Sequence, residues 1–420
     1  MYLAPKEHTM SKFSVKTENP FFTGIEIPDE FFCDRAKETE TIIRLIDNGS
    51  NIVLKAPRRI GKSSLLYHVF NQNKVKAKYN TLFVDIYGTK NAADFHAEFQ
   101  NSLLAAPFAK RAKIKKNFEA MAHGAYLSLG SYDTVAGSIS LPKIGFTPVT
   151  MPKIPLEELF GFLENCGKPV LVVFDEFQQI EEYPERMAAI LRKHIQKLNN
   201  VRFIFSGSSR HMLTTMFQLS NQPFYKSAVS MDLDILPMES YKAFCMDMFR
   251  YGNKSIDASA IEFAYYLFGG ETYLMQEAMK ESYTRISTGE IAGKETVLAA
   301  ISEMLFRKDT DYRDIMNRLN SQKERNTLYC IALEGIASGI TSSQTMKKYQ
   351  LDNASAVQNA LENLGQDKLS IIERIAKGTY VVQDRLLELW LASKSGLLES
   401  KYANAEQRFF RQREISERLP

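Results

Sequence analysis

The stretch LKAPRRIGKSSLL, residues 54–66, decides the fold class of this chain. It places glycine, lysine and serine in succession at positions 61–63, between two hydrophobic runs. In a phosphate-binding loop, glycine lets backbone N–H groups wrap around an anion, and the positive end of the following helix adds to the attraction. NIVLKAP (51–57) reads as a short buried strand, and SSLLYHVFNQ (63–72) reads as the helix behind the loop. The sequence therefore predicts a nucleotide-binding P-loop.

The positions of this loop have distinct chemical roles in the interpretation. Lys62 reaches the terminal phosphates, and the Ser63 hydroxyl holds a magnesium ion. Ala56 stands where such a loop usually opens with glycine, and this first position tolerates a small side chain better than Gly61 does. We expect the triphosphate of ATP to be bound by a continuous run of residues: Ala56, Pro57, Arg58, Arg59, Ile60, Gly61, Lys62, Ser63 and Ser64.

A second motif lies at the end of another hydrophobic strand, VLVVFDEF at 170–177. Asp175 fits a metal-site carboxylate that would act with Ser63 on Mg²⁺, and Glu176 fits the base that polarises an attacking water. The alternatives are a strand end with two solvated acids, or a site that has decayed. A dead site would have little reason to keep Lys62, Ser63, Asp175 and Glu176 together. The sequence therefore predicts an active site in which Lys62, Asp175 and Glu176 are catalytic.

A third strand, VRFIFSGSS at 201–209, ends in a polar cluster. Ser206 or Ser208 is placed to lie between the two acids and to sense the γ-phosphate. A serine-rich turn that caps the following helix through Ser209 explains the same residues, and both readings can hold for different serines. Arg210 is either a phosphate contact, in this chain or a neighbouring copy, or an ordinary surface cation.

Size and composition set the wider limits. The chain has 420 residues, 45% of them hydrophobic and 24% charged, which is typical of a globular protein of two or three domains. The net charge of +4 permits local nucleic-acid binding without arguing for it. The four cysteines are scattered, which favours buried thiols in a reducing compartment. No signal peptide or membrane-spanning run is visible, so we expect a cytoplasmic protein with no membrane role.

Apolar runs in the first half of the chain alternate with helical stretches, which favours a parallel sheet covered on both faces. Residues 34–46 precede the first strand as an amphipathic helix, and the later strands are expected at 80–88, 168–177, 201–209 and 228–237. Past Pro237 we expect the strands to stop and helices to dominate to about residue 310.

The segment 320–395 has a pattern of its own. Three helices are expected at 325–337, 341–349 and 353–366, followed by two short strands at 369–375 and 378–383 with Gly378 in the turn between them. Three helices with a two-stranded ribbon are typical of a winged helix.

Several of these stretches occur in an order that resembles a known family, the archaeal-type P-loop ATPases of the STAND branch, which is related to AAA+ proteins. The resemblance covers about residues 30–395. It rests on FFCDRAKETETIIRLI (31–46), APRRIGKSSLL (56–66), VVFDEFQQI (172–180), FIFSGSS (203–209), FGGETYLMQEA (268–278) and YVVQDRLLELWL (380–391).

This resemblance implies an α/β fold: an AAA+-like P-loop NTPase parallel sheet core, then a helical lid, then a winged-helix domain. The domains expected are a lead-in segment at 1–30, an ATPase core at 31–236 with an insertion at about 107–155, a helical lid at 237–318, a winged helix at 319–395 and a tail at 396–420.

The resemblance also places two residues near the adenine, Phe32 and Arg35, where the alternative is an ordinary helix start. The lid motif GGET carries Thr272 where the family usually has proline, which weakens the expected lid contact with nucleotide. Family members often lack an arginine finger, which implies slow hydrolysis until a partner or a nucleotide-dependent homo-oligomer completes the site. The function implied is a switch between ATP and ADP states.

Two classes of partner remain open at this point. One reading is a switch that acts on DNA, in mobile-element, replication or defence work. The other is a regulatory ATPase whose winged helix docks a protein partner, without nucleic acid. Residues 321–395 hold nine Lys/Arg and eight Asp/Glu, which is a weak basic balance for a DNA-binding module. A kinase using the same loop is a third reading, and Glu176 beside Asp175 favours water as the acceptor instead.

The insertion and the tail carry the remaining candidate surfaces. KRAKIKK, at 110–116, offers a phosphate-binding cluster for DNA through Lys110, Arg111, Lys113, Lys115 and Lys116, or else a solvated helix face. The tail EQRFFRQREISERLP (406–420) either docks on a partner or packs against its own chain.

Overall fold

The computed structural model describes residues 17–109, 154–365 and 370–417. The chain divides into two compact units: Arg35–Asp234 forms one, and Met1–Asp34 together with Ile235–Pro420 forms the other. The predicted insertion elements at 107–155, including the basic stretch at 110–116, fall almost entirely outside the described residues. Each unit is taken in turn below.

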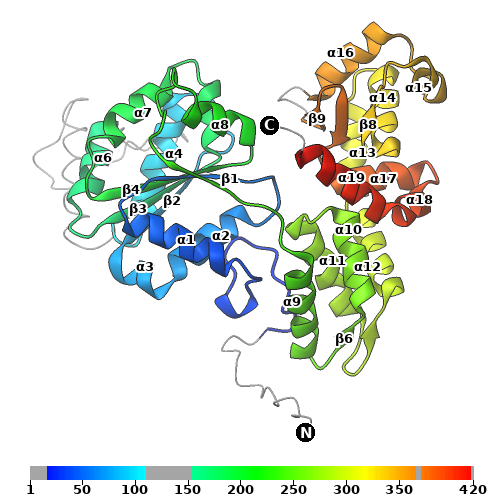
Figure 1. Ribbon diagram of the computed structural model, residues 1–420, viewed down its shortest axis with the longest axis horizontal. Helices are drawn as coiled ribbons and strands as arrows, with labels where there is room; N and C mark the ends of the chain where they lie inside the picture. The colour runs from blue at the N-terminus through cyan, green and yellow to red at the C-terminus, as the bar shows by residue number, and fades with distance from the viewer. Residues whose placement is uncertain (1–16, 110–153, 366–369, 418–420) are drawn as a thin grey trace, which may run out of the picture. The chain divides into compact units, whose positions relative to one another are not determined.

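The unit Arg35–Asp234 is built on a parallel five-stranded sheet with the order β2-β3-β4-β1-β5 (Figure 1). The side chains of β1 and β3 are buried along their whole lengths, as expected for strands covered on both faces. All five strands were predicted from their apolar runs. Their bounds are β1 (Ile52–Lys55), β2 (Asn80–Asp85), β3 (Val170–Asp175), β4 (Val201–Gly207) and β5 (Val229–Asp232).

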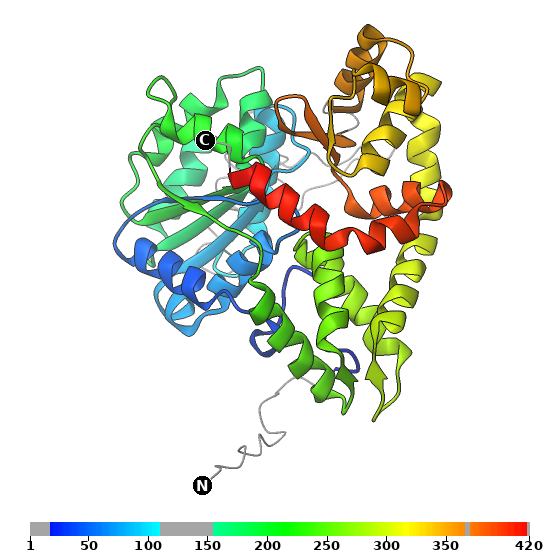
Figure 2. The same ribbon diagram turned by 45° about the vertical axis from the view of Figure 1, so that its right-hand side comes forward.

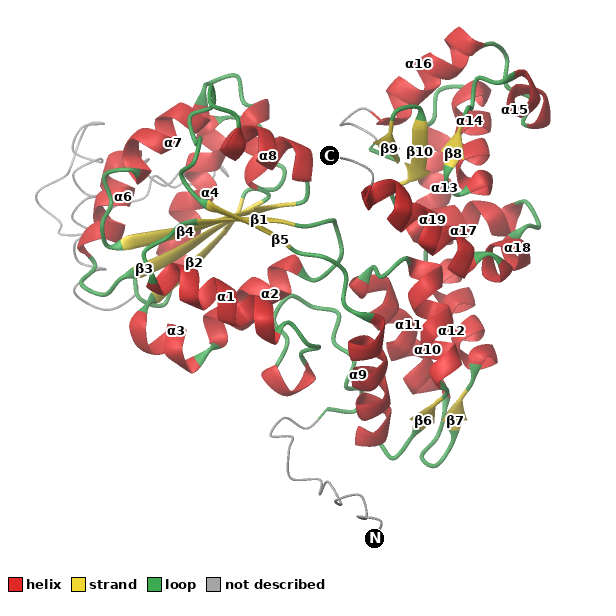
Figure 3. Ribbon diagram, in the orientation of Figure 1, coloured by secondary structure: helices red, strands yellow, loops and turns green. Residues whose placement is uncertain are grey.

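Helices cover both faces of this sheet. Figure 3 shows α1, α2 and α3 on one face and α4, α6, α7 and α8 on the other. The bounds are α1 (Ala36–Asp47), α2 (Lys62–Asn71), α3 (Asn73–Lys78), α4 (Ala92–Ala105), α6 (Leu156–Asn165), a 3-10 helix η2 (Phe177–Glu182), α7 (Met187–Ile195) and α8 (Arg210–Gln218).

Aromatic packing fixes the centre of the sheet. Phe174 of β3 and Phe203 and Phe205 of β4 stack on one face with nearly parallel rings. Phe177, the first residue of η2, packs on Phe205 with ring centroids 4.5 Å apart. This contact anchors the chain directly after the acidic motif, so the two acids project from a rigid strand end.

The other unit consists of a helical region, a winged helix and a C-terminal segment. The helical region, which we call the lid helices, comprises α9 (Met238–Tyr251), α10 (Ala258–Phe268), α11 (Thr272–Arg285), α12 (Lys294–Arg307) and α13 (Asp309–Arg318). A two-residue parallel pair, β6 (Ser255–Ile256) with β7 (Ile291–Ala292), interrupts it. The expectation that strands stop at Pro237 is therefore wrong at this one small ladder.

The N-terminal lead-in belongs to the core of this unit in its described part. Phe21 is 1% exposed and packs edge-on against Phe249 and Tyr283 of the lid helices. Phe31 ends the short 3-10 helix η1 (Asp29–Phe31) and packs edge-on against Tyr251. Two aromatic anchors therefore hold this irregular part of the chain.

The winged helix has the predicted helices and ribbon with one addition. Its three-stranded sheet has the order β8-β10-β9, and Gly378 takes a φ of 68° in the turn between β9 and β10. The strand β8 was not predicted. The elements are α14 (Gln322–Glu334), β8 (Ala337–Ser338), α15 (Ser343–Lys348), α16 (Ala354–Gly365), β9 (Ile372–Ala376) and β10 (Thr379–Val382).

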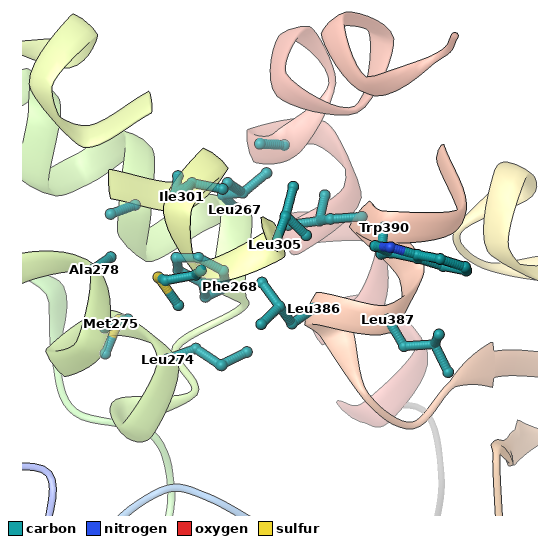
Figure 4. Close-up of a cluster of buried hydrophobic side chains, with 14 of the residues drawn as sticks. Leu267, Phe268, Leu274, Met275, Ala278, Ile301, Leu305, Leu386, Leu387 and Trp390 are labelled. Carbon is teal, nitrogen blue, oxygen red and sulfur yellow. The ribbon is translucent and has the colours of Figure 1, made fainter. Parts of the chain in front are cut away.

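The lid helices and the winged helix share one hydrophobic core, and three helices follow the wing. These are α17 (Arg385–Lys394), α18 (Leu398–Ala403) and α19 (Ala405–Glu417). In Figure 4, side chains of α10, α11 and α12 meet those of α17, where Leu386, Leu387 and Trp390 come from the winged-helix side. Asp384 caps α17 by accepting hydrogen bonds from the backbone N–H groups of its first turn.

A buried charge cluster reinforces this junction. Glu388 is 0% exposed and pairs with three cations: Arg385, Lys401 at 3.1 Å and Arg408 at 2.8 Å. Burial alone would raise the pKa of the Glu388 carboxyl, but the three cations outweigh it and lower the pKa to about 2. The cluster ties α17 to the two C-terminal helices.

The tail packs against its own chain. Figure 2 shows α19 as the red C-terminal helix, and its Phe409 lies against Tyr265 and Tyr266 of α10, with ring centroids 5.6 and 5.4 Å apart. Phe410, the next residue, is 54% exposed. In the described part of the chain, no helix is both long enough and apolar enough to cross a membrane.

Candidate nucleotide site

The glycine loop runs from the end of β1 into α2. Gly61 takes a φ of 86° at the start of α2, a conformation that glycine adopts without strain. Ala56 is fully buried, and its N–H donates to the carbonyl of Gly207 at 3.2 Å, so the opening of the loop is tied to β4. The first N–H groups of a helix have no carbonyl partner within the helix, so α2 presents donors and a positive end to this loop.

Lys62 lies between the two acids of the second motif. Its side chain is 7% exposed, and its ammonium group pairs with Oδ1 of Asp175 and lies 3.4 Å from Oε1 of Glu176. A buried ammonium requires a negative partner, and here two carboxylates supply it. The predicted catalytic residues Lys62, Asp175 and Glu176 are therefore brought together.

Two hydroxyl groups also contact Asp175, and its Oδ1 accepts a further hydrogen bond from the Glu176 N–H at 3.0 Å. Ser63 donates to Oδ2 at 2.6 Å, and Ser206 donates to Oδ1 at 2.6 Å. Ser206 reaches the acid because β4 lies between β1 and β3 in the sheet. The strand order thus brings Lys62 and Ser63 from the start of α2 and Ser206 from β4 to the same carboxylate.

The electrostatics of Asp175 follow from these contacts. Burial alone would raise the pKa of its carboxyl, but the Lys62 ammonium and the hydrogen bonds from Lys62, Ser206 and Ser63 outweigh it and lower the pKa below its ordinary value. Asp175 is therefore an anion near neutral pH. Carboxylate and hydroxyl oxygens are the ligands that Mg²⁺ prefers, so Ser63 and Asp175 fit a magnesium site.

Glu176 has an unusual backbone and a well-defined side-chain position. Its φ of 55° is in the left-handed region, which non-glycine residues seldom adopt. Its Oε2 accepts hydrogen bonds from Gln178 Nε2 at 2.6 Å, Ser208 Oγ at 2.7 Å and Ser208 N at 3.3 Å. Arg58 of the glycine loop donates to the same Ser208 Oγ at 3.5 Å. Ser208 therefore connects the loop to the acid.

The remaining predicted residues lie in different surroundings. Arg35 is 4% exposed. Its guanidinium donates hydrogen bonds to the Glu38 carboxylate at 2.7 Å and to the Asp234 carbonyl oxygen at 2.6 Å. Phe32 is half-buried and belongs to the other unit. Around the glycine loop, Pro57 and Ser64 are half-buried, Arg59 is exposed and Ile60 is buried.

The serine turn and the residue after it also have definite positions. Ser209 occupies the N-cap of α8 but makes no side-chain capping hydrogen bond. The capping alternative for this serine is therefore wrong. Arg210 donates to the Leu233 carbonyl at 2.9 Å.

Two residues of this site were not predicted from the sequence. Asp85 ends β2 and is in register with Asp175 on β3. Burial at the strand end raises the pKa of the Asp85 carboxyl, and the Asp175 and Glu176 carboxylates raise it further, against the hydrogen bond from the Tyr87 N–H. Gln178 is the second. An acid at the end of a neighbouring apolar strand was a visible signal for Asp85, whereas nothing in FQQI separates Gln178 from Gln179.

The arrangement provides what phosphoryl transfer to water needs. It combines a glycine loop at the start of α2, a buried lysine, carboxylate and hydroxyl oxygens, and a second carboxylate beside them. Catalysis of this kind relies on positioning and charge more than on covalent chemistry from the protein.

Comparisons with known proteins bear on the same residues. The profile of a family described as an ATPase domain predominantly from Archaea matches residues 32–278. A second profile, described as a probable winged helix domain, matches residues 310–393. A search of curated proteins found no match.

Two solved structures share the fold. The Walker-type ATPase paby2304 of Pyrococcus abyssi is 20% identical, with a TM-score of 0.59 over 89% of this chain and 99% of its own. The ORC2 protein of Aeropyrum pernix, solved as ADPNP–ADP complexes, is 12% identical, with a TM-score of 0.50 over 88% of this chain and 95% of its own. The predicted fold class and the resemblance to archaeal-type P-loop ATPases with a C-terminal winged helix are confirmed.

Proposed function

Because the chain belongs to the family of ATPase domains found predominantly in Archaea, we propose that it is a nucleotide-controlled switch of the STAND type. The chain is an ATPase, which converts ATP and water to ADP and phosphate. The proposal concerns how its residues divide this reaction and what the reaction controls.

The single observation that carries the proposal is the convergence on Asp175. Lys62, Ser63 and Ser206 all bind this one buried carboxylate, and Glu176 follows it in the chain. A structural ion pair would need one cation. Two hydroxyls and a second acid beside it are the groups that a metal–triphosphate complex requires.

The protein residues then act as follows. Lys62 exchanges its carboxylate partners for the terminal phosphates, which the backbone donors of the loop also bind. Oε1 of Glu176 then no longer faces the ammonium and takes a proton from the attacking water. As it does so, the oxygen of that water bonds to the γ-phosphorus, and the bond between this phosphorus and ADP breaks. Mg²⁺, held by Ser63 and Asp175, would neutralise developing charge on the phosphates.

The continuous core of the other unit supports a switch as the output. The lid helices and winged helix are joined by shared apolar packing and by the buried Glu388 cluster. A change that reaches the lid helices would therefore carry the winged helix with it, because packed cores shift as units. We propose that hydrolysis is slow and that ATP favours assembly or engagement of a partner.

The winged helix is the proposed contact surface, and DNA is the first candidate partner. Exposed Gln358, Asn359 and Asn363 on α16 are side chains of the kind that read base edges, and Arg374 on β9 with Lys377 in the β9–β10 turn supplies positive charge. The Lys110–Lys116 cluster remains an additional DNA candidate that lies outside the described residues.

A protein partner is the second candidate, and one observation favours it. The described part of α16 contains no Lys or Arg, and Glu362 is exposed on it. Strong DNA binding needs several phosphate contacts from cations, because each contact releases counterions. A helix without cations fits a protein surface at least as well.

Light scattering after size exclusion on the Glu176→Gln protein tests these alternatives. We expect ATP to increase the mass of the particle relative to ADP, because the variant should bind ATP without hydrolysing it. Comigration of a DNA duplex that disappears in high salt supports the DNA candidate, and ATP-dependent assembly unchanged by nuclease supports the protein candidate. A mass that is identical with ATP, ADP and no nucleotide would refute the switch.

A further inference from the structure

Gln178 has a position that its neighbours do not share. The residue is 7% exposed, and its Nε2 donates to Oε2 of Glu176 at 2.6 Å. Nε2 of Gln179, the next residue, instead donates to Oε2 of Glu182, and this hydrogen bond of 2.6 Å is exposed to solvent. Two adjacent glutamines therefore have different roles, and the first of them lies inside the site.

The backbone of β4 is shaped around this amide. A Cβ added at Gly207 would lie 1.9 Å from Oε1 of Gln178, which is far inside any real contact distance. Gly207 does not have a positive φ, so the obstacle to a Cβ at this position is the space that the Gln178 amide occupies, and the amide would have to shift to admit one. The strand thus leaves room for one particular side chain.

The two oxygens of Glu176 are consequently unequal. Oε2 accepts hydrogen bonds from Gln178 and from both the hydroxyl and the N–H of Ser208, which saturates it. Within the described residues, Oε1 accepts no hydrogen bond and faces Lys62 at 3.4 Å. Once the lysine turns to phosphate, Oε1 is the oxygen that remains open to water.

We propose that Gln178 is a positioning residue that fixes Oε2 of Glu176 and so presents Oε1 to the attacking water. The inference rests on the proposed role of Glu176 as the base. Gln178 acts through Glu176 and makes no contact with ATP in this proposal. Its loss should therefore slow the chemical step and leave nucleotide binding intact.

Steady-state kinetics on full-length variants test the proposal. Gln178→Met keeps the volume of the side chain and removes the donor, and we expect kcat to fall about tenfold while KM for ATP stays within about twofold. Gln179→Met is the matched control and should leave kcat and KM at wild-type values. Calorimetry with a non-hydrolysable ATP analogue should give wild-type affinity for all of these proteins.

Gly207→Ala provides an independent arm, because the new methyl group displaces the amide without altering it chemically. We expect a similar loss of kcat in the wild-type background and almost no further loss when Gly207→Ala is added to Gln178→Ala. The positioning role is wrong if Gln178→Met keeps the wild-type kcat, if its loss lies in KM or affinity, or if the two changes are additive.

The Glu176→Gln variant distinguishes an error in the role given to Gln178 from an error in the proposed function. If Glu176→Gln hydrolyses ATP at the wild-type rate, the base assignment itself is wrong and Gln178 has no base to position. If Glu176→Gln is inactive while Gln178→Met is fully active, the base assignment survives and the role given to Gln178 does not.

Discussion

Nε of Arg385 donates a buried hydrogen bond of 2.7 Å to the carbonyl oxygen of Leu267. The bond joins the first turn of α17 to the last turn of α10, so a winged-helix element directly holds the end of a lid helix. The same arginine pairs with Glu388 one turn further along α17. Backbone, ion pair and apolar packing therefore act at one junction.

Glu388→Gln should strongly destabilise this unit. The change leaves Arg385, Lys401 and Arg408 without their buried anion, and breaking a buried ion pair in this way costs about 3 kcal/mol or more. Urea unfolding followed by the emission of Trp390, the one tryptophan of the chain and a residue of α17, measures the effect. Glu399→Gln, at an exposed position of α18, is the control and should leave the midpoint almost unchanged.

The contribution of Glu388 should vanish in acid. Its folded-state pKa of about 2 lies below the ordinary 4.5, so its stabilisation is fully present above pH 4.5 and is lost as the pH falls towards 2. A shift of this size corresponds to about 3 kcal/mol. The difference in unfolding free energy between wild type and Glu388→Gln should shrink over this range. A difference that stays constant from pH 6 to about pH 2 would contradict the assignment.

Lys62→Ala should abolish binding of ATP. The change removes the ammonium proposed for the terminal phosphates and leaves the buried Asp175 carboxylate without its cation. Calorimetry with ATP and Mg²⁺ should register no binding, and circular dichroism checks that the variant is folded. Lys78→Ala is the control: this lysine pairs with Asp47 on the surface, and its variant should bind ATP normally. ATP binding by folded Lys62→Ala would remove the role given to this lysine.

Glu176→Gln should separate binding from hydrolysis. The amide keeps the shape of the side chain but does not take a proton from water, so we expect ATP to bind with kcat reduced by about 100-fold or more. Phosphate release under single-turnover conditions measures the chemical step directly. Glu181→Gln, in the 3-10 helix η2 that follows Glu176, should hydrolyse ATP at the wild-type rate. Unchanged turnover in Glu176→Gln would point to another base.

Phe409 and Phe410 form a matched pair in the C-terminal helix. Phe409→Ala removes a ring packed against Tyr265 and Tyr266, and we expect a loss of about 2 kcal/mol for this partly buried site. Phe410 is 54% exposed, so Phe410→Ala should cost less than about 1 kcal/mol. Denaturation midpoints of the two variants check the order. Equal losses would contradict the larger contribution assigned to Phe409.

The sequence predicted the five strands of the sheet and the residues that meet around Asp175. Every residue of a strand such as β3 is buried, so the strand is visible in the sequence as an unbroken apolar run. A loop that binds an anion needs glycine and lysine at a fixed spacing, which is also visible in the sequence. These constraints are local. The convergence of Lys62, Ser63 and Asp175 follows from them once the strands lie parallel.

What the sequence did not reveal depends on distant partners. The strand β8 and the β6–β7 pair have two residues per strand, which is too short to show any alternation. Gln178 is indistinguishable from Gln179 until Gly207 of another strand lies against it. The anchoring of Phe21 and Phe31 likewise depends on helices more than two hundred residues away in the chain.

The shared core of the lid helices and winged helix also limits where the gene can be divided. A junction placed at the end of α12, inside the gap that the two family profiles leave between residues 278 and 310, would separate Ile301 and Leu305 from their partners on α17. Exchange of the winged helix between relatives would therefore have to carry the lid helices with it. Recombination, natural or engineered, should succeed only where the whole unit is inherited as one module.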